Sequence, residues 1–120
     1  MTYSKMIVSL TSIAAMFVAA CGSAALPIDK LSEAKSTVRA AQEAGAQGTP
    51  QAQLHLKMAN DELASAQKAI DDNDGDRARL LLNQAQADAD LSLILARGSA
   101  DQRAAQAAQA KIVELSKQAQ

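Results

Sequence analysis

The acidic run at residues 71–76 is the densest group of side chains in this chain that could bind a metal ion. It reads Asp-Asp-Asn-Asp-Gly-Asp, and calcium sites use oxygen ligands on a loop that turns at a glycine. The spacing argues against such a site. With Gly75 at the sixth loop position, the first position holds Ile70 and the twelfth holds Leu81, and neither side chain can coordinate a cation. We therefore predict a solvated turn that caps helices.

Two further groups could serve in catalysis or metal binding. His55 is the only histidine, and no cysteine, second histidine or glutamate lies at ligand spacing from it, so we expect a surface or rim residue without a partner. Asp61 and Glu62 are adjacent, and consecutive helical residues diverge by about 100°, so we expect them on a hydrated face. We predict no catalytic, metal-binding or cofactor-binding residue, no small-molecule substrate, and a protein that is not an enzyme.

Cys21 is the only thiol, and it closes the run Val18-Ala19-Ala20-Cys21. An apolar stretch from Met6 to Phe17 follows Lys5, and it is too short to span about 30 Å of hydrocarbon as a permanent helix. The run resembles the lipobox of bacterial lipoproteins. The resemblance implies that residues 1–20 are a signal peptide and that lipid is attached to Cys21 as the mature N-terminus. The alternative is an ordinary secretory signal ending in Ala-x-Ala, with an incidental cysteine.

The composition after residue 20 excludes several classes of function. Tyr3 and Phe17 are the only aromatic residues, and both lie in the leader, so surfaces that stack sugars or bases have no aromatic ring to use. The formal net charge is −1, and acidic and basic residues are interspersed without a basic stripe. Nucleic acid is therefore excluded as an expected partner.

Helix formers dominate the chain, and breaks between them divide it. Alanine and glutamine are abundant from Leu31 onward, which predicts an all-α fold. Residues 21–28 are expected to form a tether, and residues 29–120 an alanine-rich helical domain. The first helix is predicted to begin with Asp29 as its N-cap and to end near Ala44. Gly48-Thr49-Pro50 predicts the start of a second helix that runs to about Asp72, with proline at the first helical position.

The turn at residues 73–76 is expected to introduce a third helix from about Arg77 to Lys117, capped by Asp76. Apolar residues at alternating steps of three and four predict one buried stripe on each of the first two helices. The stripes are Leu31, Ala34, Val38 and Ala41, and then Leu56, Ala59, Leu63, Ala66 and Ile70.

The first half of the third helix carries apolar residues on two opposite sides. One face holds Ala78, Leu82, Ala85, Ala89, Leu93 and Ala96, and the other holds Leu80, Ala87, Leu91 and Ile94. Two interpretations remain open at this point. The second face is either an additional surface for a neighbouring helix or subunit, or a widening of a single core face.

The third helix should be much longer than the others, on the order of 60 Å against roughly 25 and 35 Å. These lengths predict a three-helix up-down-up bundle with a long third helix overhanging the first two. The overhang carries the stripe Ala105, Ala108, Ile112 and Leu115, which no other segment is long enough to cover unless the helix folds back at Gly98. We predict that this stripe binds a second copy of the chain or an envelope protein near the peptidoglycan.

Together with the lipobox, several alanine-rich elements point to a family. They are the segment at residues 40–46 and the pattern of Leu63, Ala66, Ala69, Gly75, Asp76, Ala78, Ala85, Asp88 and Ala89. The chain resembles alanine-rich proteobacterial lipoproteins that are classified as a domain of unknown function and are often found beside outer-membrane-protein-A-like peptidoglycan-binding proteins. The resemblance covers most of residues 21–115 and implies a location but no activity.

By resemblance to lipoprotein sorting, Gly22 in place of aspartate after Cys21 implies release to the outer membrane. The sequence therefore predicts a lipid-anchored lipoprotein in the inner leaflet of the outer membrane, facing the periplasm, with a structural or protein-interaction role. The alternative is a lipid-tethered adaptor or accessory subunit of an envelope transport machine.

Overall fold

The computed structural model describes residues 25–119, which form three α-helices and one short 3-10 turn. They are α1 (Ile28–Glu43), η1 (Ala46–Gly48), α2 (Pro50–Asp71) and α3 (Gly75–Gln118). The described residues contain no strand, so the all-α prediction is confirmed. Cys21 and the predicted signal peptide lie outside the described residues.

The start of α1 differs from the prediction. Pro27, not Asp29, is the N-cap, and the Pro27 carbonyl accepts a hydrogen bond from the Leu31 amide at 3.1 Å. Asp29 instead lies in the first turn, where a carboxylate interacts favourably with the positive end of the helix dipole. The helix ends as expected, because Gly45 adopts φ 85°, a left-handed conformation that favours glycine.

The break before α2 contains the unpredicted turn η1, which buries the Ala46 side chain. Pro50 is the first residue of α2, as predicted. Thr49 occupies the N-cap position, but its hydroxyl makes no capping hydrogen bond. Preorganisation of the backbone by proline therefore starts this helix without a side-chain cap.

The turn before α3 is shifted from the predicted position by two residues. Asn73 takes the left-handed conformation in this turn, with φ 59°. The helix consequently begins at Gly75, and the cap is Asp74, whose carboxylate accepts a hydrogen bond from the Arg77 amide at 3.0 Å. Asp76, the predicted cap, lies in the first turn.

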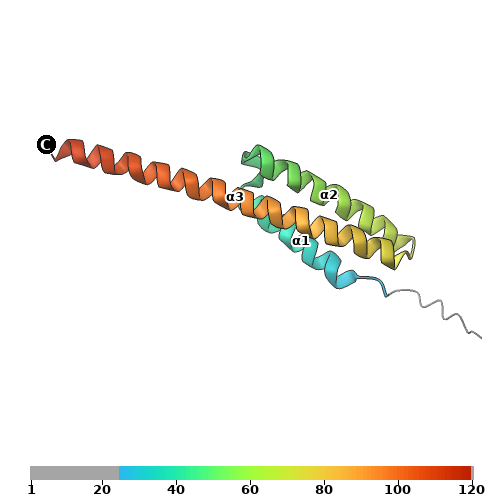
Figure 1. Ribbon diagram of the computed structural model, residues 1–120. Coiled ribbons are helices and arrows are strands. Elements are labelled where there is room, and N and C mark those ends of the chain that lie inside the picture. Colours follow the sequence, from blue (N-terminus) through green and yellow to red (C-terminus); the bar gives the residue numbers. More distant parts are fainter. Residues whose placement is uncertain (1–24, 120) are drawn as a thin grey trace, which may run out of the picture.

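Figure 1 shows the up-down-up order of the three helices. The first and third are parallel: Lys30 Nζ donates to Asn83 Oδ1 at 2.8 Å, and further along Gln86 Nε2 donates to Thr37 Oγ1 at 3.0 Å. The second runs antiparallel to the third, as the pairs His55–Asp88 and Ala52–Ser92 show. The end of the bundle where α1 begins is therefore also the end where α3 begins.

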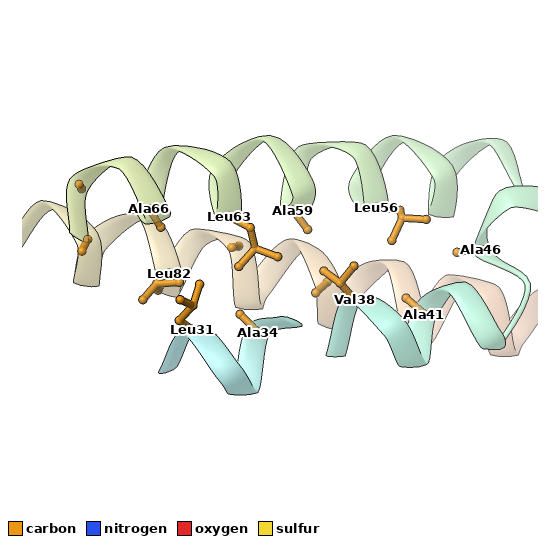
Figure 2. Close-up of a cluster of buried hydrophobic side chains, with 14 of the residues drawn as sticks. Leu31, Ala34, Val38, Ala41, Ala46, Leu56, Ala59, Leu63, Ala66 and Leu82 are labelled. Carbon is orange, nitrogen blue, oxygen red and sulfur yellow. The ribbon is translucent and has the colours of Figure 1, made fainter. Parts of the chain in front are cut away.

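The core is built mainly from alanine and leucine, and the predicted stripes of α1 and α2 are buried throughout. Figure 2 shows Leu31, Leu63 and Leu82 pointing toward one another from the three helices, with alanines filling the space between helix backbones. Small side chains allow close helix approach but bury little apolar area each. The few buried leucines therefore carry much of the packing.

The overhang of α3 is confirmed. The helix continues without interruption through Gly98, so it does not fold back. Every residue from 100 to 119 is exposed. At its start this exposed segment still borders the first two helices, since Asp101 lies beside Ala44 and Arg103 beside Gly48. The rest of the helix, to Gln118, projects beyond the bundle (Figure 1).

Candidate interaction surface on the third helix

One apolar face of α3 is buried in the bundle, and the opposite face is exposed. On the inner face Ala78, Leu82, Ala85, Ala89 and Ala96 are buried, and Leu93 is partly buried. On the outer face Leu80 is 60 %, Leu91 40 % and Ile94 65 % exposed. The outer residues therefore form a separate apolar surface and do not widen the core.

The outer face is continuous with the stripe predicted on the overhang. From Ile94 the chain reaches Gly98, Asp101 and then Ala105 in steps of four, three and four, so all of them lie on one line along the helix. We call this line the outer stripe. It comprises Leu80, Gln84, Ala87, Leu91, Ile94, Gly98, Asp101, Ala105, Ala108, Ile112 and Leu115, all of them exposed.

The predicted site residues therefore belong to a larger surface than expected. Ala105, Ala108, Ile112 and Leu115 are all exposed, Ile112 and Leu115 by 65 % and 51 %. Leu80, Leu91 and Ile94 lie on the same face of α3, in the part of the helix that packs against α1 and α2, and they are exposed as well. The sequence contained this signal, but Gly98 and Asp101 interrupt the apolar run and conceal the link between its two halves.

A polar cluster between α2 and α3 was not predicted. His55 Nδ1 lies 2.7 Å from Asp88 Oδ1, with the two side chains only 25 % and 17 % exposed. The expectation that His55 has no partner is therefore wrong. The antiparallel register of α2 and α3 brings together two residues 33 positions apart, which spacing along one chain cannot indicate.

Glu62 also faces this cluster, whereas its neighbour Asp61 is exposed. Burial raises the pKa of Glu62, and the nearby charges of Asp88 and Asp61 raise it further. Its Oε2 atom is buried and has no hydrogen-bond partner among the described residues. The expectation of a hydrated face thus holds for Asp61 and is wrong for Glu62.

We expect Glu62→Gln to raise the melting temperature at pH 7. Because the pKa of Glu62 is higher in the folded than in the unfolded chain, its ionised form costs stability above the folded pKa, and this cost disappears below the unfolded pKa. The contribution of Glu62 to stability therefore falls as the pH rises from its unfolded pKa to its folded pKa. An amide at this position stays neutral and can donate to Asp88.

Thermal unfolding followed by circular dichroism between pH 4 and pH 8 measures the effect. The gain in melting temperature should shrink toward pH 4. Glu33→Gln, at an exposed position on α1, serves as the control and should show little gain at either pH. A Glu62→Gln variant with the wild-type melting temperature at pH 7 would contradict this account of the cluster.

Ser92 is the other polar residue that the sequence analysis missed. Its side chain is fully buried, and its Oγ donates to the Ala52 carbonyl at 2.8 Å. The hydrogen bond satisfies the hydroxyl and fixes α3 against the first turn of α2.

Residues 25–119 hold no group of three His, Cys, Asp or Glu side chains placed to bind a metal ion. Within the same part of the chain, no helix is long and apolar enough to cross a bilayer. The acidic turn at residues 71–76 instead caps α3 through Asp74, which agrees with the predicted solvated turn.

These features define a class of all-α proteins with a small three-helix bundle and a long, exposed third helix. Within that class, the chain belongs to the family described as Domain of unknown function (DUF4398), which matches residues 29–112. The matched region ends within the overhang and covers all of the outer stripe except Leu115. No curated protein and no solved structure matches the chain.

Proposed function

We propose that this protein is a lipid-anchored lipoprotein of the outer membrane, facing the periplasm, which serves a structural or protein-interaction role in the cell envelope. Cys21 is its lipidation site, and the outer stripe of α3 is its interaction surface. The outer-membrane location and a neighbourhood of outer-membrane-protein-A-like, peptidoglycan-binding proteins come from the lipoprotein resemblance.

The observation that carries the interaction role is the exposed half of α3. Isolated helices gain little stability from propensity alone, and most helical stability in proteins comes from packing of an apolar face. The twenty residues at 100–119 have such a face, and nothing in the described chain covers it. A partner for this face is thus the simplest reason for its apolar residues.

The arrangement of helices suits a tethered protein. The chain enters α1 at the end of the bundle where α3 also begins, and the overhang extends from the opposite end (Figure 1). A lipid on Cys21 would leave the overhang free to meet a second copy or an envelope protein.

Cys21→Ser is expected to abolish lipid attachment, because the thiol is the only side-chain group in the chain able to form the thioether with diacylglycerol. Cells that express the full chain are labelled with a radioactive fatty acid, and the protein is recovered by an affinity tag. Ser23→Ala, two residues away, is the control and should keep its label. Undiminished labelling of Cys21→Ser would overturn the lipoprotein assignment.

A further inference from the structure

The outer stripe has the spacing of a coiled-coil seam over its full length. Its members follow one another in steps of four and three from Leu80 to Leu115, which is a heptad pattern extending about 50 Å along the helix. The stripe lies opposite the buried residues of α3, so most of it faces away from α1 and α2. Near the end of the bundle it borders them, because Ile94 lies beside Thr49 and Asp101 beside Ala44. A helix of another molecule therefore has room to pack along it.

Side-chain sizes along the stripe are distributed unevenly. Leu91 and Ile94 form one large group, Ile112 and Leu115 form another, and only small or short residues lie between them, from Gly98 to Ala108. In a parallel pair of identical helices each residue meets its own copy. Large residues would then meet at both ends, and the small residues between them would leave a gap.

We propose that a second copy of this chain packs antiparallel along the outer stripe. In the register that fits best, Leu91 faces Ala108 of the second copy, Ile94 faces Ala105 and Ala87 faces Ile112. Each of these layers joins one large and one small side chain, so the helix separation stays even across them. At the centre of the pair the short side chain of Asp101 lies against Gly98 of the second copy. By symmetry each contact occurs twice, which makes the interface isologous.

The charges beside the stripe select the same register. Asp90 and Lys111 each precede a stripe residue and so lie along the same edge of α3. In the proposed pair Asp90 faces Lys111 of the second copy, and the symmetry gives two such ion pairs. A shift of the second copy by one heptad in one direction places Arg97 opposite Lys111 of that copy. A shift in the other direction places Arg97 opposite its own equivalent. Like charges therefore disfavour both shifted registers.

Asp101 supports the antiparallel direction as well. In a parallel pair its carboxylate would meet Asp101 of the second copy within the seam. In the antiparallel pair it faces Gly98 of the second copy, next to Arg97 of that copy. The one charged residue of the stripe thus gains a neighbour of opposite sign.

This arrangement accounts for both exposed parts of α3 at once. The overhang of each copy covers Ala87, Leu91 and Ile94 in the bundle region of the other. It also places the two starts of α1 about 50 Å apart at opposite ends of the pair. The segment before α1, residues 21–27, can extend about 23 Å in each copy, so both lipids could enter one membrane if the pair lies along its surface.

The inference rests on the proposed interaction role of α3 and names the partner, but it does not depend on lipid attachment. The test uses two full-length copies with different tags, co-expressed in cells, one with Leu91→Cys and the other with Ala108→Cys. Isolated membranes and soluble fraction are both treated with an oxidant, and dimers carrying both tags are measured. Wild-type copies, whose only thiol is Cys21, give the background.

The expected result is a strong disulfide between the two tagged copies, with little between two copies that both carry Leu91→Cys. Adding Asp90→Lys to both copies should lower the yield about tenfold, since two attractions become repulsions. Adding Lys111→Asp as well should restore it, because the opposite charges meet again across the pair. Asp90 and Lys111 lie too far apart on one helix for this rescue to arise within a monomer.

Three outcomes would overturn the inference: a dimer linked through Leu91→Cys in both copies, no rescue by the double charge reversal, or disulfides to another protein alone. The last outcome would leave the proposed function standing, with a different partner. If Cys21→Ser kept its fatty-acid label while the antiparallel disulfide still formed, the lipoprotein role would be refuted and the pairing would stand.

Discussion

Leu82→Ala is expected to unfold the bundle or lower its stability by about 2–5 kcal/mol, the usual range for a buried leucine replaced by alanine. Leu82 is only 1 % exposed and is one of the largest fully buried side chains among the described residues. It contacts a core in which most neighbours are alanines, which cannot move far enough to fill the space. In a bundle this small, such a loss is a large fraction of the total stability.

The chain offers a matched control two residues away. Leu80 lies on the outer stripe and is 60 % exposed, so Leu80→Ala should change the unfolding free energy by less than about 0.5 kcal/mol. Urea unfolding followed by circular dichroism compares the two variants under conditions where the chain is monomeric. Equal effects of both substitutions would mean that the two faces of α3 are not separated into core and surface.

The helices and their buried faces were predictable because they depend on local spacing. Steps of three and four identify a buried stripe without knowledge of its partner, and the stripes on α1 and α2 are buried as predicted. The length of α3 was predictable because no proline interrupts residues 77–117 and Gly98 alone does not end a helix.

Details of the turns were harder to predict. Asn73 and Gly75 can both adopt a left-handed backbone, and Asp74 and Asp76 can both cap a helix, so sequence alone allows two positions for the start of α3. The structure selects Asn73 and Asp74. At the start of α1, the proline at position 27 makes the helix begin before Asp29.

The polar cluster required information that a single sequence does not contain. His55 and Asp88 meet because α2 and α3 pack in one particular register, and Glu62 comes near Asp88 for the same reason. Helical periodicity gives the face of each residue but not its level against another helix. The continuity of the outer stripe, by contrast, follows from counting along one helix and needs no tertiary information.

Replacing Ile112 and Leu115 together by aspartate is expected to abolish association through α3. Both side chains are more than half exposed in the single chain, so the monomer loses almost no packing. In the proposed pair they would lie against Ala87 and Gln84 of the second copy. The double substitution would bury four carboxylates per dimer there, and their desolvation would cost far more free energy than the remaining contacts contribute. We expect dimers of the full chain to fall at least a hundredfold, while the bundle of residues 29–97 remains folded.

Crosslinking in cells and light scattering on the purified protein measure the association, and circular dichroism reports the bundle. The control is the pair Ala110→Asp and Val113→Asp, which adds the same charge to the same turns but lies off the stripe. Because aspartate near a helix C-terminus opposes the dipole, both variants should fray equally, and only the stripe variant should lose its partner. If the two variants dissociate alike, charge or fraying rather than the outer stripe governs association, and the interaction surface lies elsewhere on the molecule. If neither dissociates, the exposed face of α3 is not the surface by which this protein meets its partners.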